Sequence, residues 1–192
     1  MTDILLVRHG QTDWNLDRRI QGQSDIQLNS AGLAQAESFA SGLTDQHYDL
    51  LISSDLQRAV QTARIIAARL SLPVHCDQRL REVDHGDWEG MLISDVLQQF
   101  GKEYTAFRNE PEHSRAPGGE TLNEAFERVT SVIEENAIQF PAGRILVVSH
   151  GLVIALLRCK VNGLPFNMAH QFGLDNCAGD LIHWSSSLLH KG

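Results

Sequence analysis

Two short apolar segments, far apart in the chain, both end in the dipeptide His-Gly. They are residues 4–7 (ILLV), followed by Arg8-His9-Gly10, and residues 144–149 (RILVVS), followed by His150-Gly151. Each segment has the length and composition of a buried strand. If both are parallel strands of one sheet, their imidazoles lie at the same sheet edge, where open α/β sheets bind ligands. Either histidine alone could simply hydrogen-bond the next loop, but two at one edge are hard to attribute to chance.

Apolar strands alternate with amphipathic helices through the rest of the chain. The patterns predict further strands at 48–53, 73–76 and within 173–184, and helices at 30–43, from 54 or 55 to 70, at 120–140 and at 152–161. This alternation predicts an α/β fold, a three-layer α/β/α sandwich whose mostly parallel central sheet carries helices on both faces. A length of 192 residues suits a single domain over 1–192. Residues 91–118 fit the alternation least well, and we expect a lid or insertion there.

Capping residues and periodicity also predict where the helices begin and which faces they bury. Asn29 or Ser30 is expected to cap the first long helix, and Ser54 or Asp55 the second. The first helix is expected to pack on the core through one face that holds Leu33, Phe39, Ala40 and Leu43. Gly118-Gly119 is expected to form the turn before a helix that opens with Glu120.

Composition and charge exclude several classes of protein. Hydrophobic residues make up 42% of the chain, charged residues 21%, and the formal net charge is −8. This charge argues against nucleic acid or anionic lipid as a partner. The apolar runs are too short to span a membrane, and the N-terminus does not resemble a signal peptide, so we expect a cytoplasmic protein. The three cysteines have no spacing typical of disulfides or zinc sites, and the histidines outside the His-Gly pair have no metal-ligand spacing. A homodimer is compatible with the sequence.

The cations near the strand ends indicate a site for an anionic small molecule. Arg8 stands beside His9, and Arg58 lies in the first turn of the helix that follows the strand over 48–53. Guanidinium groups offer planar forks of N–H donors that suit phosphate oxygens. Gly10 would let the backbone approach a ligand closely. An isolated arginine such as Arg58 could equally be a solvated surface residue.

Six motifs, read in order, resemble those of the histidine phosphatase superfamily with its phosphoglycerate mutase-like fold, in the branch of small phosphatases. They span residues 4 to about 155 and are LVRHGQTDWN from Leu6, QG with Asp25 and Leu28 from Gln21, SSDLQRAVQTA from Ser53, LRE from Leu80 with GDWEG from Gly86, PGGET from Pro117, and VVSHG from Val147. No Walker A loop and no H-E-x-x-H motif occur.

This resemblance implies a role for each candidate site residue. His9 would be the nucleophile that accepts the phosphoryl group, and Arg8, Arg58 and His150 would stabilise charge on the transferring oxygens. Glu82 would give the leaving group its proton; the alternatives are a salt bridge to Arg81 or Arg79, or a catalytic role for Asp84, Asp87 or Glu89 instead. Contacts with the phosphate or the substrate body are expected from a second set: Asn15, Gln21, Gly22 and Gly151. No metal and no cofactor are implied.

The expected reaction is metal-independent hydrolysis of a small, anionic phosphorylated metabolite. Mutases of this family carry a basic and aromatic stretch after the catalytic glutamate, whereas Glu82 is followed here by Val83-Asp84-His85-Gly86. That difference favours a phosphatase over a phosphoglycerate mutase-type phosphotransferase, which remains an alternative, as does a non-catalytic phosphoryl-binding module. The family acts on several phosphorylated metabolites, and the motifs do not decide which of them is the substrate here. We favour α-ribazole 5'-phosphate or a broad specificity that includes sugar phosphates.

Overall fold

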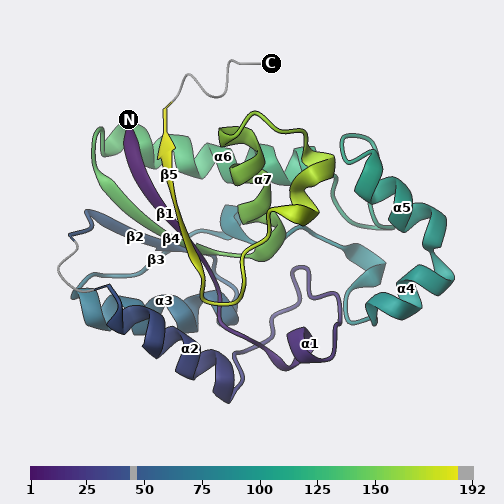
Figure 1. The fold of residues 1–192 in the computed structure, drawn as a ribbon, viewed down its shortest axis with the longest axis horizontal. Coiled ribbons are helices and arrows are strands. Elements are labelled where there is room, and N and C mark those ends of the chain that lie inside the picture. The colour runs from purple at the N-terminus through teal and green to yellow at the C-terminus, as the bar shows by residue number, and fades with distance from the viewer. Residues whose placement is uncertain (44–46, 186–192) are drawn as a thin grey trace.

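The computed structural model describes residues 1–43 and 47–185 and contains one five-stranded sheet. Its strand order is β3-β2-β4-β1-β5. The first four strands in that order run parallel, and β5 pairs antiparallel to β1 at the edge (Figure 1). Their bounds are β1 Thr2–Arg8, β2 Leu50–Ser53, β3 His75–Cys76, β4 Arg144–Ser149 and β5 Gly179–Trp184.

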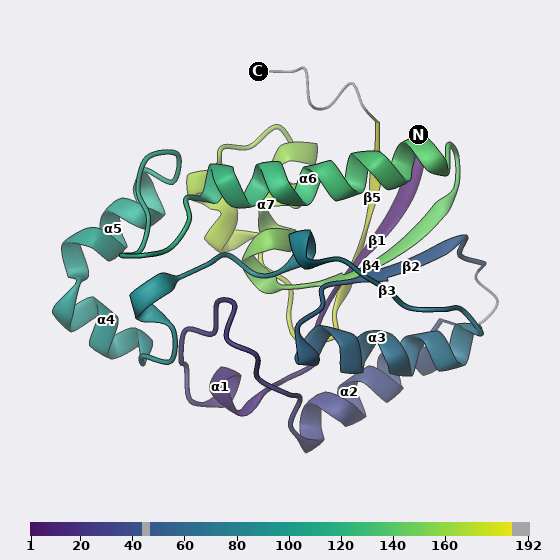
Figure 2. The same ribbon diagram turned by 180° about the vertical axis from the view of Figure 1, so that it is seen from behind.

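Helices cover both faces of this sheet, which confirms the predicted three-layer α/β/α sandwich. One face is covered by α2 (Ser30–Ser41) and α3 (Gln57–Leu70), and the other by α6 (Leu122–Gln139) and α7 (Gly151–Val161) (Figures 1 and 2). Two clusters of buried apolar side chains separate the sheet from these two helical layers. None of the helices in the described ranges is long and apolar enough to cross a membrane.

The two strands that end in His-Gly are adjacent and parallel, as predicted. Arg8 at the end of β1 is in register with Ser149 at the end of β4. Because β2 pairs with the other side of β4, the start of α3 arrives at the same sheet edge. The middle of β1 (Ile4 to Val7) and of β4 (Ile145 to Val148) is wholly apolar because helices cover both faces of the sheet there.

The segment over 91–118 contains two short helices beyond the carboxyl ends of the strands. They are α4 (Ile93–Gln99) and α5 (Gly101–Asn109), and they lie on the same side of the molecule as the short α1 (Asp13–Leu16) (Figures 1 and 2). Phe107 of α5 is buried and packs edge-on against Trp88. The single-domain assignment and the lid role of this segment stay predictions.

Several local predictions about helices were wrong. Leu33 is 43% exposed, because the buried face of α2 runs through Gly32, Ala36 and Ala40. Asn29 caps α2 as expected, but α3 begins after Leu56 without a side-chain cap. The long helix opens with Leu122 after a capping box formed by Thr121 and Glu124, so Glu120 lies outside it. The remaining helices and strands match the predicted ranges to within a few residues, apart from β5, which occupies only the second half of 173–184.

Gly10 has a different purpose from the one that the sequence suggested. A Cβ atom at Gly10 would lie 2.5 Å from the carbonyl oxygen of Gly32, and a Cβ at Gly32 would lie 2.1 Å from that of Gln11. The glycine pair therefore lets the loop after β1 pack directly on the first turn of α2. Close approach of two protein backbones, not of a ligand, explains Gly10.

We expect Gly32→Ala to destabilise the fold by about 1 to 3 kcal/mol, because the added methyl group overlaps the backbone of Gln11. Gly42→Ala is the matched control at the other end of α2, where a Cβ would meet its nearest atom at 3.4 Å. Urea unfolding of both variants measures the difference. Equal free energies of unfolding for the two variants would contradict the packing explanation.

Candidate active site

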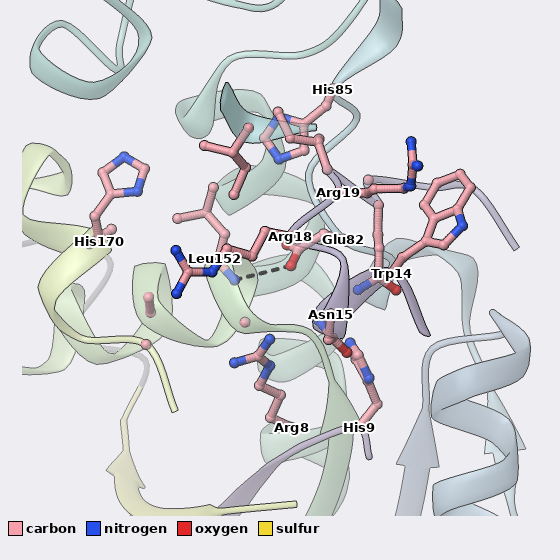
Figure 3. Close-up of a pocket in the computed structure, with 18 of the residues that line it drawn as sticks. Arg8, His9, Trp14, Asn15, Arg18, Arg19, Glu82, His85, Leu152 and His170 are labelled. Carbon is pink, nitrogen blue, oxygen red and sulfur yellow. Dashed lines mark hydrogen bonds between the residues drawn. The ribbon is translucent and has the colours of Figure 1, made fainter. Parts of the chain in front are cut away.

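A cavity of about 480 Å³ lies beyond the carboxyl ends of β1 and β4. Its floor is formed by residues at the strand ends, including Arg8 and His9, and α7 contributes Gly151 and Leu152 (Figure 3). The lining includes every candidate site residue from the sequence except His150: Arg8, His9, Asn15, Gln21, Gly22, Arg58, Glu82 and Gly151.

His9 is held as a neutral imidazole with one nitrogen available. Its Nδ1 lies 2.7 Å from the carbonyl oxygen of Gly10, which can only accept, so Nδ1 carries the proton and Nε2 has a lone pair. The side chain is almost fully buried, with 3% of the residue exposed. Burial lowers the pKa of His9 well below its usual value, and the charges of Arg58 and Arg8 lower it further. The arginine effect was predicted, but burial contributes more.

Arg8 presents an unused hydrogen-bond donor at the cavity. Its Nη1 donates to the carbonyl of Leu174 at 2.6 Å, whereas the buried Nε has no partner in the described part of the chain. Gly151 permits this placement, because a Cβ there would lie 3.3 Å from that Nε. An unsatisfied buried donor costs about 1 to 3 kcal/mol, and an anionic ligand would remove that cost. Burial also lowers the pKa of Arg8 from its usual value.

Arg58 is a completely buried cation held by three protein acceptors. Its Nη2 donates to the carbonyl of Gly22, its Nη1 to the carbonyl of Ser24, each at 2.7 Å, and its Nε to Nδ1 of His150 at 3.2 Å. Burial lowers its pKa to about 10, so the guanidinium stays charged at neutral pH. The surface alternative for Arg58 was therefore wrong. Gly22 has φ of +51°, and its own Cβ would overlap the Glu89 carboxylate, so glycine is needed to present this carbonyl.

His150 lies beside the cavity instead of lining it. Its Nδ1 accepts from Arg58, so in the neutral ring Nε2 carries the proton and donates to Oγ of Ser54 at 2.8 Å. Its ring centroid is 5.2 Å from that of His9. Burial first, then the charge of Arg58, lowers the pKa of His150 well below its usual value. In this structure His150 is a neutral group that orients Arg58.

Glu82 caps the first turn of α7. Its two carboxylate oxygens accept backbone N–H bonds from Leu152 at 3.1 Å and Val153 at 3.2 Å, the first of which is the dashed line in Figure 3. The salt-bridge alternative was wrong, because Arg81 pairs with Asp55 and Arg79 pairs with two other acidic residues, Asp77 and Glu135. Among the described residues, Glu82 is the one acidic residue that lines the cavity.

Arg128 on α6, paired with Glu120 just before that helix, holds the loop that carries Glu82. Arg128 donates to the backbone carbonyls of Arg79, Arg81 and Glu82 at 2.7 to 2.8 Å. The same guanidinium pairs with Glu120, whose carboxylate also accepts the N–H of Asp84. Sequence reasoning missed Arg128, since a helix arginine distant in sequence gives no sign that it binds a loop.

Asn15 and Gln21 are oriented by Thr12 at the start of α1. The Asn15 side-chain oxygen accepts the N–H of Thr12 at 3.0 Å, and the Gln21 side-chain oxygen accepts the Thr12 hydroxyl at 3.0 Å. Both amide groups therefore keep their NH2 ends without a protein partner in the described ranges. Those ends are hydrogen-bond donors suited to an anion.

The far wall of the cavity includes two histidines that were not predicted. It contains His85, which follows Glu82 in the same loop, and His170, with Phe107 between them. Burial lowers the pKa of both imidazoles, that of His170 to about 4. Arg18 and Arg19 also line the cavity. No motif marked these residues, because they come from loops and from the irregular segment after α7.

We expect the fold to lose stability as the pH falls below about 6.5. His9 and His150 are buried and neutral, so the unfolded chain, with ordinary histidine pKa values, binds protons that the folded chain does not. Stability is therefore full above the unfolded pKa and is lost toward the lowered folded pKa. His9 and His150 together should lower the free energy of unfolding by about 2 kcal/mol between pH 6.5 and 5.5, and His85 and His170 should add to the fall because burial lowers their pKa values as well.

Urea unfolding across this pH range checks the slope. His150→Gln removes one of the two buried imidazoles and should make the slope shallower by about one proton. A free energy of unfolding that stays constant from pH 7.5 to 5.5 would show that these imidazoles are not held neutral.

Comparison with known proteins assigns the family. The histidine phosphatase superfamily (branch 1) matches residues 4–188. Phosphoserine phosphatase 1 from Hydrogenobacter thermophilus is 33% identical over 183 residues, covering 95% of this chain and 87% of that protein. A probable phosphoglycerate mutase from Yersinia pestis is 36% identical over 188 residues, covering 97% of this chain and 87% of that protein.

A solved structure agrees in fold as well as in sequence. The α-ribazole phosphatase from Shigella flexneri superposes with a TM-score of 0.84 at 31% identity, covering 96% of this chain and 91% of that one. The family match extends over nearly the whole chain, and relatives above 30% identity include named phosphatases. The chain belongs to the histidine phosphatase superfamily, and it is a phosphatase of that family.

Proposed function

We propose that this phosphatase hydrolyses phosphate monoesters of small metabolites through a phosphohistidine on His9, without a metal ion or other cofactor. The observation that carries the proposal is the neutral His9, whose Nδ1 is occupied by Gly10 and whose Nε2 is unprotonated at a cavity lined by Arg8 and Arg58. A neutral imidazole is a competent nucleophile near pH 7.

In the first step, Nε2 of His9 forms a bond to phosphorus while the bond from phosphorus to the ester oxygen breaks. Arg8, through its unpartnered Nε, and Arg58 bind the phosphoryl oxygens and stabilise their charge. Glu82 transfers a proton to the departing alkoxide. His150 does not contact the phosphate in this mechanism; it orients the guanidinium of Arg58 through a hydrogen bond.

In the second step, water attacks the phosphohistidine. The Glu82 carboxylate takes a proton from that water, the new phosphorus–oxygen bond forms, and the nitrogen–phosphorus bond breaks to release inorganic phosphate. His9 returns to its neutral form. The same carboxylate thus serves as acid and then as base, which requires it to reach both the leaving oxygen and the water.

We expect His9→Ala to abolish hydrolysis of p-nitrophenyl phosphate measured in EDTA, because among the described residues His9 is the imidazole that lines the cavity floor beside Arg8 and has a free nitrogen. The loss should reach at least about a thousandfold, as for removal of other catalytic nucleophiles. Equal rates in wild type and variant would exclude His9 as the nucleophile. Loss of wild-type activity in EDTA would indicate a metal-dependent reaction.

We expect Glu82→Gln to slow poor leaving groups far more than good ones. An alkyl phosphate needs a proton on its leaving oxygen, whereas p-nitrophenolate leaves without much help. The ratio of kcat/KM for the two substrates should therefore change by about a hundredfold between wild type and variant. An equal loss on both substrates would mean that Glu82 is not mainly the acid.

The physiological substrate is proposed only as a class, a small anionic phosphate monoester such as α-ribazole 5'-phosphate or a sugar phosphate. The solved relative named as an α-ribazole phosphatase supports the first candidate. The relative named as a phosphoglycerate mutase supports phosphoglycerate as an alternative substrate. Incubation with 3-phosphoglycerate separates the two reactions, because a phosphatase releases inorganic phosphate and a mutase forms 2-phosphoglycerate. A cytoplasmic location and a homodimer stay predictions.

A further inference from the structure

The cavity contains more positive charge than a single phosphate group requires. Four arginines line it, Arg8, Arg18, Arg19 and Arg58, against the single carboxylate of Glu82. A phosphate monoester carries a charge close to −2 at neutral pH, and Arg8 and Arg58 at the cavity floor are enough to balance it. The other two arginines therefore need a separate explanation.

Arg19 is already committed to the protein. Its Nη1 donates to the carbonyl of Gly90 at 2.9 Å, and its Nε lies 3.4 Å from the carboxylate of Asp17. In Figure 3 its guanidinium lies to one side of the cavity, whereas the Arg18 side chain extends into it. Arg18 has no side-chain hydrogen bond or ion pair with any residue in 1–43 or 47–185. It is the uncommitted cation of the cavity.

The backbone of Arg18 is held in a conformation that rarely suits a side chain. Its φ is +57°, in the left-handed region that favours glycine. Its carbonyl accepts the N–H of Ile93 at the start of α4, and its N–H donates to the carbonyl of Asn15. Arginine at this position thus carries a conformational cost, and the backbone contact with α4 holds the main chain of Arg18 at the cavity.

Among the described residues, the arginines that line the cavity beyond its floor are Arg18 and Arg19, and Arg19 is already paired. His170 is neutral at physiological pH because burial lowers its pKa to about 4, and the neighbouring wall includes Tyr104, Phe107 and Leu152. We propose that Arg18 determines specificity by binding a second anionic group of the substrate, a carboxylate or a second phosphate, beyond the phosphate that is cleaved. This inference rests on the proposed phosphate site at His9, Arg8 and Arg58.

Binding of three phosphonates, measured by calorimetry, tests the inference without depending on turnover. Propylphosphonate has one anionic group, 3-phosphonopropionate adds a carboxylate, and propane-1,3-bisphosphonate adds a second phosphonate. Wild type should bind at least one two-anion probe about tenfold more tightly than propylphosphonate. The probe with the advantage identifies the second group as carboxylate or phosphate.

Arg18→Gly is the decisive variant, because glycine suits the left-handed backbone and the fold should be kept. The tenfold ratio between probes should fall to about one. Ser71→Gly is the matched control, since Ser71 has φ of +55° at the end of α3, and it should keep the wild-type ratio. Arg69→Gln, a charge change on the same helix, should keep it as well.

Three results would overturn the inference: no advantage for either two-anion probe in wild type, an advantage that survives in Arg18→Gly, or an equal loss for all three probes. The last would mean that Arg18 acts on the cleaved phosphate itself. Propylphosphonate tests the phosphate site separately. If it fails to bind wild type, the proposed function is contradicted, whereas loss of the two-anion advantage alone contradicts only the role of Arg18.

Discussion

The parallel pairing of β1 with β4 is the interaction on which the site depends. It sets Arg8 in register with Ser149, so that His9 and His150 follow at the same sheet edge with their rings 5.2 Å apart. Because β2 pairs with the other side of β4, it delivers α3 and Arg58 to the same place. A shift of one residue between β1 and β4 would turn every side chain of the shifted strand to the opposite face and separate these groups.

Burial decides what the assembled groups can do. The cationic Arg58 is tolerated inside the protein because two carbonyls and a neutral imidazole accept its hydrogen bonds. The same burial, together with the arginine charges, holds the pKa of His9 low and leaves Nε2 unprotonated. Glu82 is held differently. Its carboxylate accepts hydrogen bonds from the backbone of α7, and Arg128 donates to the backbone of its loop. The site therefore rests on elements from the whole length of the chain.

The sequence was informative where function follows from a strand end and poorly informative where it follows from loop contacts. The fold class and the meeting of His9 and Arg58 at one cavity were predicted, because parallel strands bring their carboxyl ends together, whereas the place of Glu82 was implied by the family resemblance. The predictions for Leu33 and Gly10 were wrong, because the hydrophobic periodicity does not indicate that α2 packs through Gly32 against the backbone of the loop after β1. Arg18 was not predicted, because its backbone is held at the cavity by a hydrogen bond from Ile93, which is distant in sequence.

The central claim is that phosphate is transferred twice, first to His9 and then to water. The stereochemical course at phosphorus tests this most directly, with a substrate made chiral by oxygen isotopes and sulfur and with the configuration of the released thiophosphate as the readout. Each in-line displacement inverts the configuration, so two displacements predict overall retention. Overall inversion would mean that water attacks the substrate directly, and it would contradict a phosphohistidine intermediate on His9.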